Sequence, residues 1–206
     1  MGNALPLLGT GLGLAAGAGL NAYAVLLVYG GISRLFPDAF PGPIAHLFAS
    51  TPALALFSVL FLLEFFADKI PGLDHIWHVL HSVVRPLVGA LLAVAAVAPE
   101  GSTLLNVVAG GGGGVVALIA HLVKSATRLT STALTAGMAN AALSLAEDVL
   151  AFLQSLVAIF LPMVALVVVL ALALLFLVTV PRVARSVNLH SRRRVAPPPP
   201  TGGPAA

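Results

Sequence analysis

Long apolar stretches, separated by short turns or charged residues, make up most of the chain. The first stretch, residues 5–34, carries no charge before Arg34 and could cross about 30 Å of hydrocarbon as a single helix. Later stretches end at Pro, Gly or charged residues, which punctuate membrane segments. The pattern predicts six membrane segments, over residues 5–34, 52–67, 74–98, 103–128, 139–160 and 162–180.

The composition indicates a membrane protein rather than a soluble one. Hydrophobic residues make up 59% of the chain and charged residues 8%, with a mean hydropathy of +1.07. A soluble domain usually carries about 25% charged residues, so these charges could not cover a water-exposed surface of this size. We therefore expect an all-α integral membrane protein, in the cell's inner (plasma) membrane. The absence of cysteine excludes disulfides, thiolate nucleophiles and Cys-ligated metals.

Basic residues predict the orientation. Half of the Lys and Arg residues lie in residues 182–206, directly after the last apolar stretch, which by the positive-inside rule puts both termini in the cytoplasm. We expect residues 1–181 to form the transmembrane domain and residues 182–206 a basic, then Pro/Gly-rich, disordered tail. Because no aromatic residues alternate with these arginines, the expected partners are anionic lipid headgroups rather than nucleic acid.

Glycine is concentrated in the first and fourth stretches. We expect Gly17, Gly19, Gly111 and Gly113 to lie where the two long helices formed by these stretches cross closely, since small residues allow backbones to approach. The alternative for the run of glycines at residues 110–114 is a break in the helix, because each Gly costs a helix about 1 kcal/mol relative to Ala.

A gap-free match suggests an internal repeat. Residues 17–35 align on residues 111–129, each ending in Arg-Leu after a Gly-rich start. The match would divide the domain into two inverted three-helix repeats, residues 5–98 and 103–180, as in many secondary transporters. The alternative is chance, since apolar segments align easily.

Polar side chains within or beside the apolar stretches are the main functional signal, because a charge at the bilayer centre costs about 3 kcal/mol or more. Acids and bases nearly balance, so we expect them to face each other across a bundle interior or a water-filled cavity. The plainer alternative is ion pairing at helix ends. The candidates for a substrate or proton pathway are Asn21, Glu64, Asp68, Asp74, His81, Arg85, His121, Lys124, Arg128, Asn140, Glu147 and Asp148.

Glu147 and Asp148 are the most informative pair, since they interrupt an apolar stretch well inside its ends. Adjacent helical residues point about 100° apart, so the two carboxylates cannot share one site. We expect one to meet Arg128 or Arg85 and the other to line a cavity. A buried carboxylate is also the usual proton carrier of coupled transporters.

Metal and catalytic motifs are weak or missing. Asp74, His78 and His81 share a helical face and could ligate a divalent metal, but histidines at a membrane interface are the favoured interpretation. No cofactor is expected, because the glycine run lacks the Lys-Ser/Thr of a phosphate-binding loop. No complete catalytic set is visible, so we expect no enzymatic activity.

Several polar signatures together resemble a known family. Leu63–Asp74 is followed by Trp77, His81, Arg85-Pro86 and Gly89–Leu92, and further signatures are Gly19–Tyr23, Ala120-His121 with Lys124, Thr127-Arg128, Asn140 and Ser144–Asp148. Over about residues 8 to 160 the chain resembles the bacterial membrane family catalogued as domain of unknown function 4126. The resemblance implies a small multi-pass membrane protein of unassigned activity. The chain departs from the family pattern at His78, where an acid is expected, and at Thr135–Gly137, where a Ser-Pro turn is expected.

The sequence therefore favours a small transporter or channel-like protein with a buried charged site, handling a small solute or ion. The alternative is a non-transporting membrane scaffold or assembly partner, and an intramembrane enzyme acting on lipid has the least support. A mid-depth cavity lined by these polar residues would favour transport, whereas a sealed bundle with every charge paired would favour a scaffold.

Overall fold

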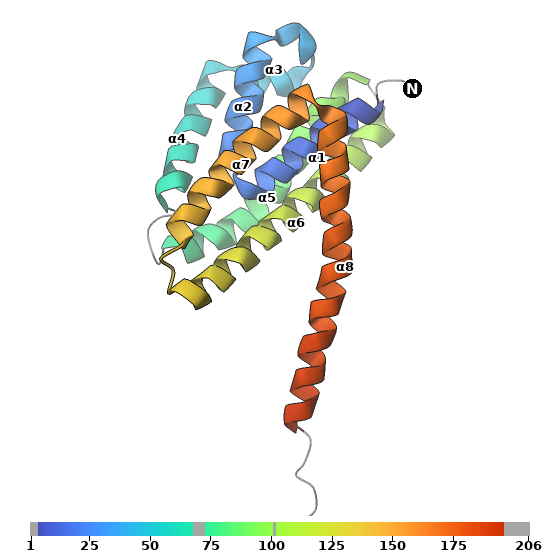
Figure 1. Cartoon of the computed structure of the whole chain (residues 1–206). Coiled ribbons are helices and arrows are strands. Elements are labelled where there is room, and N and C mark those ends of the chain that lie inside the picture. The colour runs from blue at the N-terminus through green and yellow to red at the C-terminus, as the bar shows by residue number, and fades with distance from the viewer. Residues whose placement is uncertain (1–3, 68–72, 101, 196–206) are drawn as a thin grey trace, which may run out of the picture. The chain divides into compact units, whose positions relative to one another are not determined.

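The computed structural model describes residues 4–67, 73–100 and 102–195, with side chains over 4–67, 80–99 and 102–178. Regular structure in these ranges is entirely helical, which confirms the predicted all-α class (Figure 1). The chain divides into two compact units, Met1–Leu170 and Ala171–Ala206. The elements are α1 (Ala4–Leu20), α2 (Ala22–Leu35), η1 (Pro37–Ala39), α3 (Pro43–Ala49), α4 (Thr51–Ala67), α5 (Leu73–Val97), η2 (Ala98–Glu100), α6 (Thr103–Thr135), α7 (Asn140–Phe160) and α8 (Pro162–Val195).

Helix α1 packs against α5, α6 and α7 in the first unit, and α5 and α6 run alongside each other (Figure 1). The buried face of α1 is made largely of glycine and alanine, so neighbouring backbones come close to it. A Cβ built on Gly19 would overlap the carbonyl oxygen of Ala117, and one on Gly11 would lie 2.9 Å from Cα of Ala93. Van der Waals contacts between closely spaced backbones, rather than contacts between large side chains, therefore stabilise the packing of these helices.

The glycine run at residues 110–114 lies inside the continuous helix α6, so the alternative of a helix break is wrong. Gly113 packs tightly on α5, where a Cβ would lie 2.6 Å from the carbonyl oxygen of Gly89. Gly17 lies against α7, with the carbonyl oxygen of Ala151 at 3.3 Å from a built Cβ. Gly111 has no neighbour within 4 Å of such a Cβ, so the predicted crossing of the two long helices is wrong at that position. Of the four glycines it is confirmed only at Gly19, which packs on α6, because Gly17 packs on α7 and Gly113 on α5.

The predicted single span over residues 5–34 is wrong, because Asn21 separates α1 from α2. Asn21 has extended dihedrals, φ −146° and ψ 105°, and its side chain caps α2 by accepting a hydrogen bond from the Ala24 amide at 2.9 Å. A Cβ built on Gly17 would lie 3.0 Å from Cγ2 of Val25, although a straight helix would place these residues about 12 Å apart along its axis. The chain therefore folds back at Asn21, because its amide is a better helix cap than a helix-interior residue.

Three other boundaries differ from the predictions. The segment between residues 36 and 52, which lies outside the six predicted membrane segments, contains η1 and α3. Helix α6 continues to Thr135 rather than 128, and it ends where Ala136 and Gly137 adopt positive φ values of 51° and 85°. Helix α8 continues to Val195 rather than 180, so the basic part of the predicted tail is helical up to that residue.

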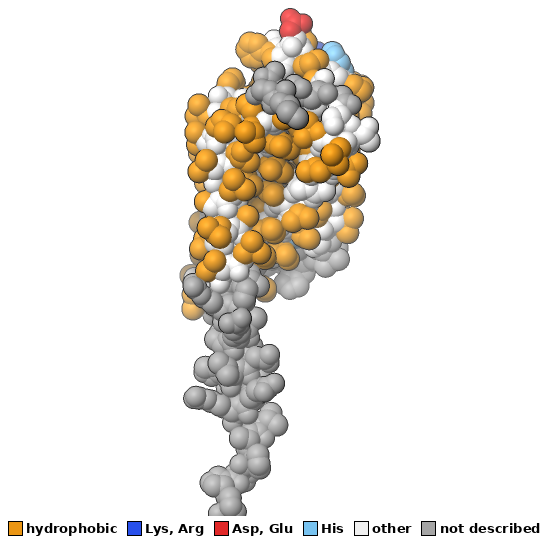
Figure 2. Space-filling model, turned by 90° about the vertical axis from the view of Figure 1, so that its right-hand side faces the viewer, with side chains coloured by type: hydrophobic (Ala, Val, Ile, Leu, Met, Phe, Trp, Pro, Cys, Tyr) orange, Lys and Arg blue, Asp and Glu red, His pale blue; other side chains and the backbone are white. Residues whose placement is uncertain are grey.

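The distribution of polar and apolar side chains is the reverse of that in a soluble protein. Three helices are long and apolar enough to cross a membrane among the described residues, within Leu80–Val97, Thr103–Thr135 and Asn140–Phe160. Four shorter apolar helices accompany them, Ala4–Leu20, Ala22–Leu35, Thr51–Ala67 and Pro162–Val178. Figure 2 shows a face of the first unit covered mainly by hydrophobic side chains, while Glu64 and Arg85 are buried. The apolar helices indicate a location in a membrane.

The two glycines of α6 give a matched test of close packing. We expect Gly113→Ala to lower the free energy of unfolding by about 1–3 kcal/mol, because the methyl group would overlap α5. Gly111→Ala is the control and should leave stability equal or slightly higher, since its methyl group meets open space and improves helix propensity. Unfolding of both variants in detergent measures the difference, and equal destabilisation would show that Gly113 is not at a close contact.

Candidate buried charged site

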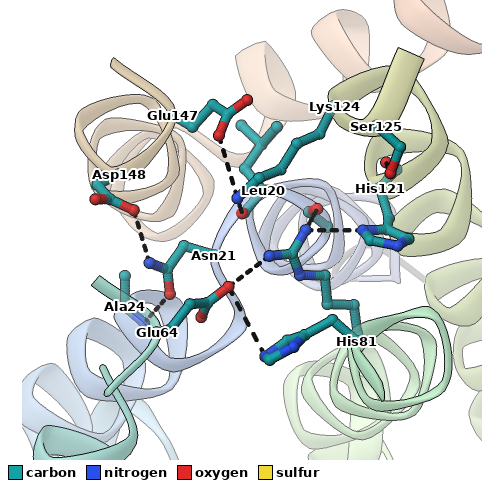
Figure 3. Close-up of polar contacts among 12 residues, drawn as sticks. Leu20, Asn21, Ala24, Glu64, His81, His121, Lys124, Ser125, Glu147 and Asp148 are labelled. Carbon is teal, nitrogen blue, oxygen red and sulfur yellow. Dashed lines mark hydrogen bonds and ion pairs between the residues drawn. The ribbon is translucent and has the colours of Figure 1, made fainter. Parts of the chain in front are cut away.

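The break between α1 and α2 leaves backbone carbonyl groups at the end of α1 without partners in the helix. These carbonyls are the negative end of the helix dipole and need donors when buried. Two cations from other helices supply them: Arg85 Nη1 donates to the Gly19 carbonyl at 3.0 Å, and Lys124 Nζ donates to the Leu20 carbonyl at 2.8 Å. The end of α1 is therefore completed by side chains of α5 and α6 (Figure 3).

Asn21 connects the break to α7. Its side-chain oxygen caps α2, and its Nδ2 donates to Asp148 Oδ1 at 2.8 Å. Asn21 is wholly buried and Asp148 is 8% exposed. One amide thus fixes both the direction of α2 and the position of a buried carboxylate, which explains why a residue with low helix propensity stands in this apolar segment.

A second cluster joins α4 to α5. Glu64 lies on α4, and its Oε1 accepts a hydrogen bond from Arg85 Nη2 at 2.5 Å. His81 lies one turn before Arg85 on α5, with its Nε2 at 3.8 Å from the same Glu64 oxygen, and its ring meets that of Tyr23 edge-on. Glu64 and His81 are both wholly buried. The spacing of four residues therefore presents a base and a cation to one carboxylate.

Arg85 also fixes the protonation of His121. Arg85 Nη1 lies 2.8 Å from His121 Nδ1, and because a guanidinium can only donate, that ring nitrogen must accept. The remaining ring nitrogen, Nε2, then carries the hydrogen and faces Ser82 Oγ at 3.3 Å. This geometry assigns His121 as a neutral imidazole while Arg85 is in place.

A third cluster joins α6 to α7 around Glu147. Arg128 donates to Glu147 Oε2 through Nε at 3.2 Å and Nη2 at 2.7 Å, and Lys124 Nζ lies 3.2 Å from the same oxygen. Lys124 and Arg128 stand four residues apart on one face of α6, so both reach this carboxylate. Asp148, the next residue, points instead to Asn21, as the 100° rotation between adjacent residues requires.

The described charges of the site balance. The acids are Glu64, Glu147 and Asp148, and the bases are Arg85, Lys124 and Arg128. None of the six is more than 8% exposed. Removing one partner of such a set leaves an uncompensated charge at a cost of about 3–5 kcal/mol, so each pair depends on the others.

Most of the predicted site residues lie together in the structure. Asn140 lies away from them, and three other candidates fall outside the described residues or have undescribed side chains. Asn140 begins α7 and donates to Thr132 Oγ1 at 2.8 Å, towards the α6–α7 turn. Asp68 and the side chains of Asp74 and His78 lie outside the described residues, so the metal hypothesis stays a prediction. The residues that meet around the break are Asn21, Glu64, His81, Arg85, His121, Lys124, Arg128, Glu147 and Asp148.

Sequence reasoning missed the partners that carry no charge. The carbonyls of Gly19 and Leu20 are central to the site, yet residue type gives no sign of a backbone acceptor. Ser82 and Tyr23 were also missed, since single hydroxyls are common in membrane helices. The available signal was Asn21 itself, an N-cap residue directly after a glycine-rich helix.

Glu147 forms ion pairs with Arg128 and Lys124, and removing each cation should compensate to a different degree for the loss of the Glu147 charge. We expect Glu147→Gln to lose about 3–5 kcal/mol of stability, because Arg128 and Lys124 lose their shared carboxylate. Adding Arg128→Met should restore most of it, whereas adding Lys124→Met should restore less, because the Leu20 carbonyl would lose its donor. Arg34→Met is the control, since Arg34 lies outside the site and bonds to exposed Thr51.

Unfolding in detergent measures all five proteins, the wild type included. Equal rescue by the two second substitutions would show that the carbonyl contact of Lys124 contributes nothing. An unchanged stability in Glu147→Gln would contradict the buried ion pairs altogether.

The family comparison agrees with the signatures in the sequence. The family described as Domain of unknown function (DUF4126) matches residues 8–182, a range that includes every charged residue around the α1–α2 break. The match confirms the resemblance and extends it beyond residue 160. Neither curated proteins nor solved structures give a match. With this match over most of its length, the chain belongs to the DUF4126 family.

Proposed function

We propose that the protein is a small membrane transporter or channel-like protein whose buried charged site handles a small solute or ion. The observation that carries the proposal is the set of balanced charges at a helix break within an apolar bundle. Buried ionisable groups are expensive in a membrane and usually serve ion or proton pathways. Broken helices whose ends face such groups are a recurrent feature of transporter binding sites.

Charge balance suggests how such a site would couple its cargo to protons. An added ion would leave one uncompensated charge, which a proton gained or lost by a side chain of the site would cancel. Side chains from each helix that packs at the break could gain or lose this proton. The contact with Arg85 favours the neutral form of His121. The titratable groups facing the break are Glu64 of α4, His81 of α5, His121 and Lys124 of α6, and Glu147 and Asp148 of α7.

A non-transporting scaffold is the second candidate, and the pairing of the charges favours it. Glu64 meets Arg85, Glu147 meets Arg128 and Lys124, and these contacts hold helices together. A scaffold would need them only for structure. Removing both members of a charge pair therefore distinguishes the two candidates. A scaffold that kept its stability would keep its function, whereas a transporter would lose its flux.

The wider topology is part of the proposal. We propose an inner-membrane location with both termini in the cytoplasm, supported by the arginines at the end of α8, which would contact anionic lipid headgroups. The six-segment arrangement has to treat α1 and α2 as one re-entrant or broken segment, because the chain folds back at Asn21. The inverted repeat gains no support from the backbone, since residues 17–35 are broken whereas residues 111–129 lie within the continuous α6.

Flux through liposomes distinguishes the two candidates. Purified full-length protein would be reconstituted with an internal pH dye, and gradients of acetate, phosphate, chloride, Na⁺ or ammonium would be imposed. We expect the wild type to raise the flux for at least one gradient. The Glu147→Gln/Arg128→Met double variant, in which the pair is removed together, should keep its fold but lose that flux.

Arg34→Met is the matched control and should transport like the wild type, since its side chain lies outside the site. A wild-type flux equal to that of protein-free liposomes for every gradient would contradict transport and leave the scaffold. Full flux in a stable double variant would show that the Arg128–Glu147 pair has no part in transport.

A further inference from the structure

Several polar side-chain atoms on α6 and α7 are shielded from solvent without a hydrogen-bond partner among the described residues, and three of them lie near the α6–α7 turn. They are Ser131 Oγ, Asn140 Oδ1 and Ser144 Oγ. Ser144 is wholly buried. Buried hydroxyl and amide groups nearly always have a partner, so this part of the helix pair has unused capacity to bind a polar molecule.

The pairing of the two helices places these atoms beside the charged site. The Arg128–Glu147 ion pair and the hydrogen bond from Asn140 Nδ2 to Thr132 set the antiparallel register of α6 and α7. Ser131 and Ser144 lie between these two contacts. Ser131 follows Arg128 by three residues and Ser144 precedes Glu147 by three, so each hydroxyl shares a helix face with a member of the ion pair.

The side chains beside these hydroxyls are hydrogen-bond donors that suit an anion. Arg128 and Lys124 both contact Glu147 Oε2, so two cationic donors lie at this point. A guanidinium suits the planar geometry of a carboxylate, and serine hydroxyls can donate to its oxygens. Asn140 Oδ1 can only accept, so a molecule that satisfies it must carry an O–H or N–H group.

We infer that the α6–α7 pair binds a small hydroxy- or amino-carboxylate. Its carboxylate would lie against Arg128 and the hydroxyls of Ser131 and Ser144, and its own O–H or N–H would donate to Asn140 Oδ1. The inference rests on the proposed transport function and gives the chemical class of the cargo. It assigns a binding role to Ser131 and Ser144, two serines that carry no charge.

Calorimetric titration of the purified full-length protein tests the ligand class with three probes of similar size. Glycolate carries both the carboxylate and the hydroxyl, acetate lacks the hydroxyl, and glycolamide lacks the charge. We expect glycolate to bind about tenfold more tightly than acetate, the effect of one hydrogen bond to a buried acceptor, and glycolamide not to bind. Equal binding of glycolate and acetate, or binding of glycolamide, would overturn the inference.

Two substitutions test the residues. Ser144→Ala should weaken glycolate and acetate alike by about tenfold, because the carboxylate loses a donor. Asn140→Leu should remove the preference for glycolate and leave acetate unchanged. Ser155→Ala is the control on the same helix, since Ser155 is equally buried but donates to the Ala151 carbonyl at 2.7 Å. An effect of Ser155→Ala equal to that of Ser144→Ala would overturn the site.

The titration tests the binding site and the liposome flux tests transport, so the two claims can be contradicted independently. Glycolate binding without flux, under a glycolate gradient as well as those above, would keep the site and remove transport. Flux that does not depend on Ser144, together with no glycolate binding, would keep transport and remove the carboxylate cargo.

Discussion

The structure depends on the break at Asn21, where α1 ends inside an apolar bundle and leaves carbonyl groups without partners in the helix. Arg85 and Lys124 donate to those carbonyls, and each brings a positive charge into the bundle. The cations in turn require carboxylates from α4 and α7. One interruption of a helix therefore explains why charges from four other helices converge on a single point.

Glycine and alanine make this convergence possible. The side chains of α5 and α6 reach the end of α1 because Gly11 and Gly19 let their backbones lie almost against it. The same closeness keeps the ion pairs short and buried, and in such surroundings electrostatic interactions are strong and an unpaired charge is costly. A site of this kind holds the helices in place and also responds to any ion or proton that changes its balance. Structure and the proposed transport therefore use the same contacts.

The sequence predicts most helices well, since apolar length and turn residues determine α4, α5 and α7 to within a residue or two. It also predicts which charges matter, because a buried charge is conspicuous in an apolar chain. It fails at Asn21, where hydropathy indicates one long helix and the amide cap instead produces two. The sequence could not predict the role of the Gly19 and Leu20 carbonyls. Every residue has a carbonyl group, and only the fold decides which of them accept hydrogen bonds from Arg85 and Lys124. Gly111 and Gly113 look alike in sequence and differ only in what faces them.

The distance between the ends of the α1–α2 segment tests the break most directly. The chain contains no cysteine, so cysteines placed at exposed Leu5 and Leu35 would carry the only two spin labels. A continuous helix would separate these residues by about 45 Å, at 1.5 Å per residue. The account predicts a distance distribution centred well below that value, because the chain folds back at Asn21. A narrow distribution near about 45 Å would show an unbroken helix and contradict the origin of the charged site.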